Sequence, residues 1–351
     1  MLIVMEPTAT IEQTRAVCDV IKSLGFEPAP MPGEQRVAIG VVGNDRGFDD
    51  TRLRGLPGVA QVIHVSAPYK LVSREFRKRD TIIEVANGVR IGGADIVIMG
   101  GPCSVESEEQ LMTTAEYVAK AGGTVLRGGA FKPRSSPYAF QGLGLEGLKL
   151  LAQARERYGL AIITEAMDLD GADVVAEYAD IIQLGARNMQ NTALLKHVGR
   201  IGKPVMLKRG MSATVKEWLL AAEYIANEGN LNIILCERGI RSFGDATRNV
   251  MDVGAIAAVK LMTHLPVIAD PSHATGRRDL VLPVARASIA VGADGLIIET
   301  HPDPNCALSD GPQALFPDQF NDLVESARMT AATLGRPLAV AGGRRSVATT
   351  V

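Results

Sequence analysis

From residue 95 onward, short apolar runs alternate with amphipathic segments. We count eight such runs, and each is followed by a polar or glycine-bearing loop and then by a helical pattern. They cover residues 95–99, 124–127, 161–164, 180–183, 203–207, 232–236, 265–269 and 294–298. Eight strand–helix units in roughly 250 residues have the number and size of a (β/α)8 TIM barrel.

The clearest helix is predicted over residues 213–228. Its apolar residues fall on one face, and Gly229-Asn230 marks its end. A doubly wound open sheet is the alternative to a barrel, but no G-x-G-x-x-G follows the first strand. We therefore expect an α/β fold of the TIM-barrel class.

The first 65 or so residues predict a small α+β unit of their own. Strands are expected at 2–5, 37–42 and 59–65, and helices after the capping box of Thr10 and Gln13 and at 49–56. Pro28, Pro30 and Pro32 are expected to break the chain. The order β-α-β-β-α-β fits a ferredoxin-like fold. Because no catalytic residue types cluster here, we expect a binding or regulatory module.

These patterns predict four segments. Residues 1–66 form the ferredoxin-like domain, the charged residues 67–80 a linker, 81–340 the barrel, and 341–351 a tail. The barrel domain is expected to open with a hairpin over 81–91, since Asn87-Gly88 is a strong turn signal.

Composition and charge exclude several classes of protein. The net charge is −2 and only 4% of residues are aromatic, which excludes a basic nucleic-acid binder as the default interpretation. No apolar run approaches the roughly 20 residues of a membrane span, and the first residues lack the features of a secretory leader. The four cysteines form no C-x-x-C pair, so a disulfide framework is not expected. We expect a cytoplasmic protein without nucleic-acid or membrane partners.

Cationic side chains follow the predicted strands, where a barrel places its active site. They are Arg127, Lys132, Arg134, Arg187, Lys208 and Arg238. Any one of them could be an ordinary surface residue, but six in one mouth would repel each other unless anions neutralise them. Because the net charge is near zero, this is local focusing of charge. The set predicts substrates that carry phosphates and a carboxylate.

A second group follows strands one, seven and eight, which adjoin when a barrel closes. It consists of Cys103, His273, Glu299 and Asp310. Thiolate, imidazole and carboxylate together suit Mn²⁺, Fe²⁺, Co²⁺ or Zn²⁺. Each residue alone also has a structural interpretation, such as a buried cysteine or a capping histidine. Their convergence favours a divalent metal site, with Asp270 orienting His273.

Several separated motifs then agree, in order, with one family. GPCSVES, LRGGAFKPRSSPYAFQG, GARNMQN, LKRG, ADPSHATGRR and ETHPDP…ALSDGPQ resemble 3-deoxy-D-arabino-heptulosonate-7-phosphate (DAHP) synthase of type I-beta over residues 80–335. The N-terminal unit is similar to the ferredoxin-like regulatory domain of some members. The related 3-deoxy-D-manno-octulosonate-8-phosphate synthases typically have K-A-N-R-S where this chain has Lys132-Pro133-Arg134-Ser135.

The resemblance implies metal-dependent condensation of phosphoenolpyruvate with erythrose 4-phosphate, the first step of the shikimate pathway. It implies a divalent metal, no organic cofactor, feedback inhibition by phenylalanine or tyrosine, and a homo-oligomer (dimer or tetramer). The octulosonate synthase is the alternative in the same class, and a Schiff-base aldolase using Lys208 is a mechanistically distinct enzyme. A non-catalytic phosphate-metabolite sensor is the alternative from another class.

The resemblance also assigns roles by motif position. Arg127, Lys132, Arg187, Lys208 and Arg238 would hold phosphoenolpyruvate, and Glu165 would line its pocket. Arg134 and Ser135 would hold the phosphate of erythrose 4-phosphate. Cys103, His273, Glu299 and Asp310 would bind the metal. Lys132, Lys208 and Glu165 are the catalytic candidates, the last two near the attacking water.

Overall fold

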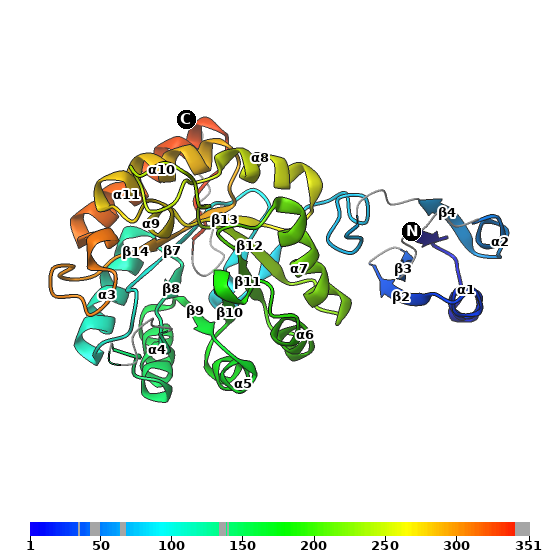
Figure 1. The fold of residues 1–351 in the computed structure, drawn as a ribbon, viewed down its shortest axis with the longest axis horizontal. Helices are drawn as coiled ribbons and strands as arrows, with labels where there is room; N and C mark the ends of the chain where they lie inside the picture. Colours follow the sequence, from blue (N-terminus) through cyan, green and yellow to red (C-terminus); the bar gives the residue numbers. More distant parts are fainter. Residues whose placement is uncertain (34–35, 43–49, 64–67, 133–137, 139, 341–351) are drawn as a thin grey trace, which may run out of the picture. The chain divides into compact units, whose positions relative to one another are not determined.

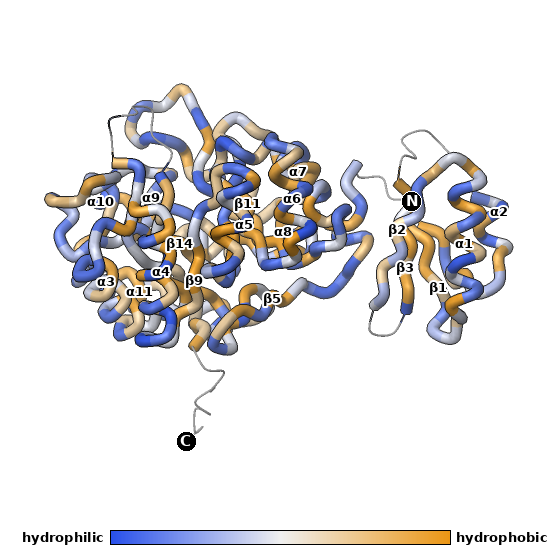
Figure 2. Tube along the Cα trace, turned by 90° about the horizontal axis from the view of Figure 1, so that it is seen from below, coloured by the Kyte–Doolittle hydropathy of each residue, from blue (hydrophilic) through white to orange (hydrophobic). Residues whose placement is uncertain are grey.

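The structure is a computed structural model that describes residues 1–33, 36–42, 50–63, 68–132, 138 and 140–340. The chain divides into two compact units, Met1–Lys78 and Arg79–Val351. Figure 1 shows their elements, and Figure 2 shows that hydrophobic residues concentrate along the strands of each unit.

The first unit is a four-stranded antiparallel sheet with two helices. Its elements are β1 (Leu2–Met5), α1 (Ile11–Ser23), β2 (Glu27–Pro32), β3 (Val37–Val42), α2 (Thr51–Arg54) and β4 (Val59–Ile63). The strand order β2-β3-β1-β4 is that of a ferredoxin-like fold, as predicted. The capping box is present, because Thr10 Oγ1 accepts from the Gln13 N–H and Gln13 Oε1 from the Thr10 N–H. The last two residues of the strand predicted at 59–65 lie outside the described residues.

The prediction that the prolines break the chain was wrong. Pro28, Pro30 and Pro32 lie within β2, which pairs with β3 alone and forms one edge of the sheet. Neighbouring residues in a strand direct their backbone N–H groups to opposite sides. The Gly33 N–H donates to Arg36 O, which places the odd-numbered residues on the bonded side. The prolines therefore fall where the missing N–H would face away from β3.

The segment predicted as a linker contributes to this unit. Lys70 Nζ donates to the backbone oxygen of Val41 at 2.6 Å. The Leu71 side chain lies over Gly40, where a Cβ would meet Leu71 Cδ2 at 3.5 Å. Residues up to Lys78 accordingly group with the small sheet.

The second unit contains the closed barrel of eight parallel strands predicted from the sequence (Figure 1). The strands are β7 (Val97–Gly101), β8 (Val125–Arg127), β9 (Ala161–Ala166), β10 (Ile181–Leu184), β11 (Val205–Lys208), β12 (Ile233–Glu237), β13 (Val267–Ala269) and β14 (Gly295–Glu299). β14 pairs with β7 and completes the circle. Each observed strand overlaps its predicted run.

Helices surround the barrel. They are α3 (Glu108–Ala121), α4 (Leu145–Tyr158), α5 (Leu169–Tyr178), α6 (Thr192–Ile201), α7 (Val215–Asn227), α8 (Val253–Met262), α9 (Pro271–Thr275), α10 (Arg278–Ala290) and α11 (Pro317–Thr333). The helix predicted at 213–228 is α7, which begins at a capping box of Thr214 and Glu217 and buries Trp218. Among the described residues, no helix has the length and apolar character needed to cross a membrane.

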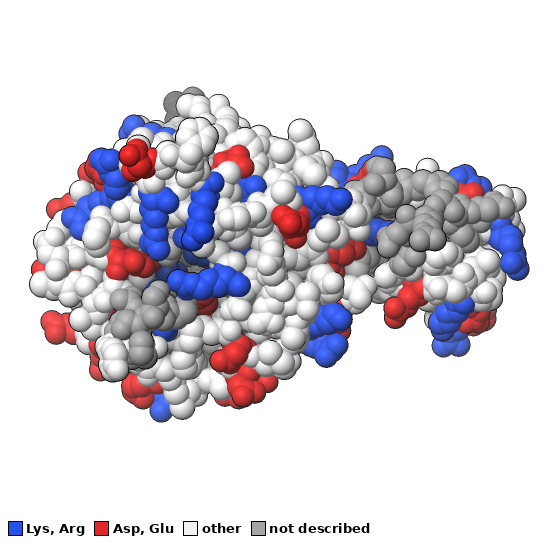
Figure 3. All heavy atoms as spheres, in the orientation of Figure 1, with Lys and Arg blue, Asp and Glu red and all other residues white. Residues whose placement is uncertain are grey.

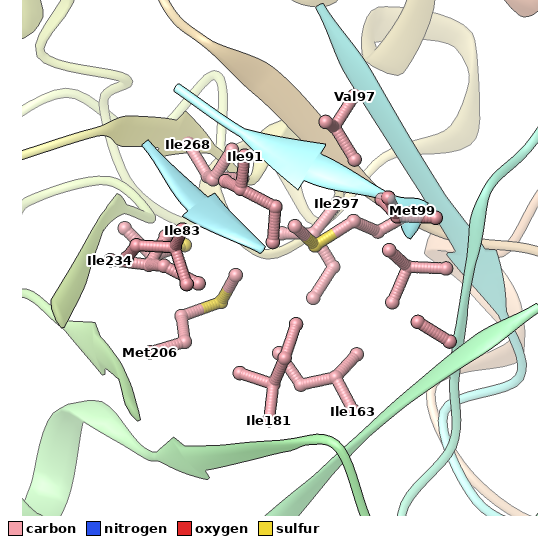
Figure 4. Packing of buried hydrophobic residues seen from close by; sticks show 14 of the residues in the cluster. Ile83, Ile91, Val97, Met99, Ile163, Ile181, Met206, Ile234, Ile268 and Ile297 are labelled. Atoms are coloured by element: carbon pink, nitrogen blue, oxygen red, sulfur yellow. The ribbon is translucent and has the colours of Figure 1, made fainter. Parts of the chain in front are cut away.

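The barrel interior is filled with side chains. Val97, Met99, Ile163, Ile181, Met206 and their neighbours form one buried cluster (Figure 4). The predicted hairpin closes the amino end: β5 (Ile83–Glu84) pairs with β6 (Arg90–Ile91), and Asn87 has the left-handed φ of 58° that its turn needs. Ile83 and Ile91 join the cluster, so the hairpin covers the amino end of the interior.

Candidate active site

A ring of polar side chains lies directly above this apolar cluster. Side chains that point into a barrel recur at every second residue of a strand. On seven strands a polar residue follows two positions after a residue of the apolar cluster. The inward-facing cluster residues are Val125, Ile163, Ile181, Met206, Cys236, Ile268 and Ile297. The corresponding polar residues are, in the same order, Arg127, Glu165, Gln183, Lys208, Arg238, Asp270 and Glu299. The same alternation that packs the core therefore aims charged groups at the carboxyl mouth.

Three of the four predicted metal ligands meet in one cluster. The ligand atoms of Cys103, Glu299 and Asp310 all lie within 4.8 Å of one another. Cys103 Sγ is 3.0 Å from Asp310 Oδ2. His273 lies beside this group, with Nε2 at 3.4 Å from Glu299 Oε1. His273 therefore adjoins the three-residue cluster through Glu299.

The donor chemistry of this cluster fits a divalent cation. Burial raises the pKa of the Cys103 thiol, and the adjacent carboxylate of Glu299 raises it further. A bound cation would reverse this penalty, because a coordinated thiol is deprotonated. His273 Nδ1 lies 2.8 Å from Asp270 Oδ2, which leaves Nε2 facing Glu299. A metal-binding histidine usually has its other ring nitrogen beside such a carboxylate.

Buried cations surround the same cluster. Arg127 Nη1 is 2.6 Å from Glu299 Oε1, and Lys132 Nζ is 2.8 Å from Cys103 Sγ. Lys208 Nζ is 2.6 Å from the Asp270 carboxylate that also faces His273. Burial alone would raise the pKa of Asp270, but His273 and Lys208 hold it well below its usual range. On the face seen in Figure 3, several Lys and Arg side chains gather near the centre of the barrel unit.

Two buried cationic nitrogens lack a partner. Within the part of the chain that the structure describes, Arg127 Nε and Arg238 Nη1 are inaccessible and make no hydrogen bond. An unsatisfied buried donor on a charged group costs more than the ~1–3 kcal/mol of a neutral one. Burial lowers the pKa of Arg238, and the nearby Arg248 lowers it further. An anion bound at either guanidinium group would remove its penalty.

The comparisons with known proteins agree with this geometry. Residues 80–333 match the model of the DAHP synthetase I family, and residues 1–67 match the DAHP synthase ferredoxin-like domain. The chain belongs to the DAHP synthetase I family. This confirms the resemblance found in the sequence, and with it a transferase enzyme built as a barrel with a ferredoxin-like domain.

The two Thermotoga maritima relatives match nearly the whole chain. Phospho-2-dehydro-3-deoxyheptonate aldolase of Thermotoga maritima is 50% identical over 335 residues, which are 95% of this chain and 99% of that protein. The crystal structure of a Thermotoga maritima DAHP synthase superposes with a TM-score of 0.77 at 49% identity, covering 96% of this chain and 98% of that one. 2-Dehydro-3-deoxyphosphooctonate aldolase of Thiobacillus denitrificans is 34% identical over 251 residues, 66% of this chain and 89% of that protein.

A pocket adjoins the Cys103–Glu299–Asp310 cluster. It is lined by Cys103, Arg127, Gly128, Gly129, Lys132, Ile163, Thr164, Glu165 and Gln183. Gln183 was missed by sequence analysis, although it stands two residues beyond the inward-facing Ile181. Its Nε2 lies 3.4 Å from Glu165 Oε2. The Glu165 carboxylate also rests against Gly185, where a Cβ would lie 2.0 Å from Oε1.

One predicted site residue, Arg187, stands apart from the buried group, and the structure does not describe two others. Arg187 is exposed in the short 3-10 helix η2 (Ala186–Asn188) that follows β10. Arg134 and Ser135 lie outside the described residues. Sequence analysis also missed Gln313, whose Nε2 donates to Glu299 Oε2 at 2.6 Å. An uncharged amide in the short 3-10 helix η3 (Gly311–Gln313) carries no signal that would single it out.

Proposed function

We propose that this enzyme condenses phosphoenolpyruvate with erythrose 4-phosphate to give DAHP and phosphate, in a metal-dependent reaction. The observation that carries the proposal is the buried nitrogen without a hydrogen bond on each of Arg127 and Arg238, among the described residues, with Arg127 beside the Cys103–Glu299–Asp310 cluster. Such donors suit a phosphate or carboxylate group. The name of the Thermotoga relative supports the same product.

In this proposal different cations bind the two substrates. Arg127, Lys132, Lys208 and Arg238 hold the phosphate and carboxylate of phosphoenolpyruvate, with Arg187 at the rim. Arg134 and Ser135 take the phosphate of erythrose 4-phosphate, as their motif implies. Holding both reactants in line supplies much of the acceleration, because a bimolecular step becomes effectively unimolecular.

Cys103, His273, Glu299 and Asp310 would hold the divalent metal, which is Mn²⁺, Fe²⁺, Co²⁺ or Zn²⁺ by donor type. When bound, the metal supplies a Lewis acid for the aldehyde oxygen. Burial alone would lower the pKa of Lys132, but Cys103 and Glu299 raise it, so this ammonium keeps its proton beside the cluster. No organic cofactor is needed.

The bonds then change as the chemistry of an enol phosphate requires. C3 of phosphoenolpyruvate attacks the aldehyde carbon, water adds at C2, and phosphate leaves by C–O cleavage. Lys208 on β11 and Glu165 on β9 lie on either side of Gln183 of β10 in the polar ring, and they are the candidates for holding that water. The fixed cations neutralise charge on the departing phosphate without having to reorganise.

The test is phosphate release from phosphoenolpyruvate. We expect release only when erythrose 4-phosphate is present, and loss of release after EDTA treatment with recovery on adding Mn²⁺. Arabinose 5-phosphate should be a poor replacement, since the octulosonate relatives match two thirds of the chain at 34% identity. Equal turnover with arabinose 5-phosphate, or full turnover in EDTA, would contradict the proposal.

We further propose that the ferredoxin-like unit binds phenylalanine or tyrosine as a feedback inhibitor, and that the enzyme is a homo-oligomer. The match of residues 1–67 to the ferredoxin-like domain of DAHP synthases supports a regulatory role. Inhibition assays with each aromatic amino acid, together with sedimentation of the full chain, test both parts.

A further inference from the structure

A buried ion pair lies directly behind two of the substrate-facing cations. Arg209 Nη1 is 2.8 Å from Glu237 Oε2, and both side chains are almost fully buried, 6% and 0% exposed. Because successive strand residues face opposite sides, Lys208 and Arg238 point into the mouth while their neighbours Arg209 and Glu237 point outward. The pair therefore joins β11 to β12 just where their ladder ends.

Each member of the pair has further partners. Arg209 Nε donates to Ala213 O at 2.9 Å, and Arg209 Nη1 also donates to Asp252 Oδ2 at 3.0 Å. Asp252 is the N-cap of α8, where its Oδ1 accepts from the Ala255 N–H. Arg209 thus ties β11 to the loop before α7 and to the start of α8.

Glu237 accepts hydrogen bonds from the backbone that follows β12 and from the backbone that follows the neighbouring β13. Its Oε1 accepts from the Gly239 N–H at 2.7 Å, which fixes the turn immediately after Arg238. Gly239 has a φ of +90°, and a Cβ there would lie 2.9 Å from Ala274 Cα, so this turn has little room to shift. The backbone oxygen of Glu237 accepts from the Asp270 N–H at 2.8 Å.

The Arg209–Glu237 ion pair is not expected to add much to the stability of the fold, because burying both charges is unfavourable. Burial raises the pKa of Glu237 in spite of the adjacent Arg209. Replacing a buried ion pair with apolar residues is often neutral or stabilising, so such a pair is weak evidence for a role in stability. Its specific hydrogen bonds instead restrain the backbone on which Lys208 and Arg238 stand.

We propose that Glu237 and Arg209 are positioning residues that hold Lys208 and Arg238 in place for the anionic groups of phosphoenolpyruvate. They act through the backbone and through Gly239, and do not touch the substrate. The proposal rests on the proposed function, because it assumes that these cations bind that substrate.

The test is binding of inorganic phosphate and of phosphoenolpyruvate to the full-length, Mn²⁺-loaded enzyme by titration calorimetry. Glu237→Gln keeps the shape and an acceptor for Gly239 but loses the charge opposite Arg209. We expect about 10-fold weaker binding of phosphoenolpyruvate. This is a smaller effect than the roughly 100-fold loss of reaction rate that a 1 Å misplacement of a reacting group can cause. The KM for phosphoenolpyruvate should rise while that for erythrose 4-phosphate stays unchanged.

Asp294→Asn is the matched control. Asp294 is a buried carboxylate of the same barrel, paired with Lys260 and Arg336 at 2.7 and 2.9 Å, and it stands before β14 at the amino end. The control should lose thermal stability without losing anion affinity. Arg209→Lys, which keeps the charge but not the fork, provides a second variant if Glu237→Gln fails to fold.

The outcomes separate the two proposals. Weaker anion binding in Glu237→Gln or Arg209→Lys, with Asp294→Asn unaffected, supports the positioning role. Wild-type anion affinity in both Glu237→Gln and Arg209→Lys, or an equal loss of anion affinity in Asp294→Asn, overturns the positioning role and leaves the proposed function intact. A wild-type enzyme that binds neither anion overturns the proposed function and this role together.

Discussion

Glu165 offers a direct test of how closely the site is built, through a glycine that touches it. Gly185 has a φ of −66°, so alanine is compatible with its backbone. The added Cβ would lie 2.0 Å from Glu165 Oε1, whereas real Cβ contacts are essentially never under 3.0 Å. The carboxylate must therefore retreat by about 1 Å, and a misplacement of that size can lower turnover by roughly 100-fold.

The cost in stability should be much smaller than the cost in turnover. Overpacking a filled site typically costs ~1–3 kcal/mol. Glu165 is only partly buried, and its contact with Gln183 is long at 3.4 Å, so its side chain can turn away. We expect Gly185→Ala to lie at the low end of that range while kcat for phosphate release falls 10- to 100-fold.

The assay compares kcat and thermal midpoint in a cycle of variants. Gly244→Ala is the control, because a Cβ at that loop position meets nothing within 4 Å. In a Glu165→Gln background, Gly185→Ala should add little further loss, since the two changes act on one group. Turnover within twofold of wild type in Gly185→Ala, or full additivity with Glu165→Gln, would refute the reasoning.

Three further outcomes follow from the site. Cys103→Ser should weaken Mn²⁺ binding at least 10-fold by calorimetry, as loss of a group that ligates or orients a metal generally does. Cys306 is exposed and paired with Asp303, so Cys306→Ser should leave Mn²⁺ binding unchanged. Equal Mn²⁺ affinities in the two variants would remove Cys103 from the metal site. Arg238→Met should raise the KM for phosphoenolpyruvate while thermal stability holds or rises, because a buried unpartnered nitrogen is lost; a large fall in the melting temperature would show that the guanidinium is structural. Deleting residues 1–78, the first compact unit, should leave phosphate release and abolish inhibition by phenylalanine or tyrosine; an equally inhibited truncation would place the effector elsewhere.

The barrel was predictable because its signal is periodic and local. Each buried strand is a short apolar run, and eight runs with intervening helices admit few other folds. Arg127, Lys208 and Glu299 were found because they extend that alternation by one step and carry charge. The relevant spacing of two residues is fixed by strand geometry and needs no knowledge of the loops.

Other features depend on contacts between distant segments. The prolines of β2 are compatible with a strand because β3 lies on one side and none of the described strands lies on the other. Gln313 reaches Glu299 through a loop that the strand pattern does not describe. The pair Arg209–Glu237 is formed by neighbours of the obvious candidates, whose outward direction makes them look structural in the sequence.

The apolar filling of the barrel also has an electrical consequence. Beneath the polar ring lies a continuous hydrocarbon floor, closed at the far end by Ile83 and Ile91 of the hairpin. Such a floor is poorly polarisable and holds no mobile ions, so it screens the ring weakly from below. The field of the buried cations is then directed outward through the mouth. A protein whose total charge is −2 can in this way present an approaching phosphate with a locally positive entrance.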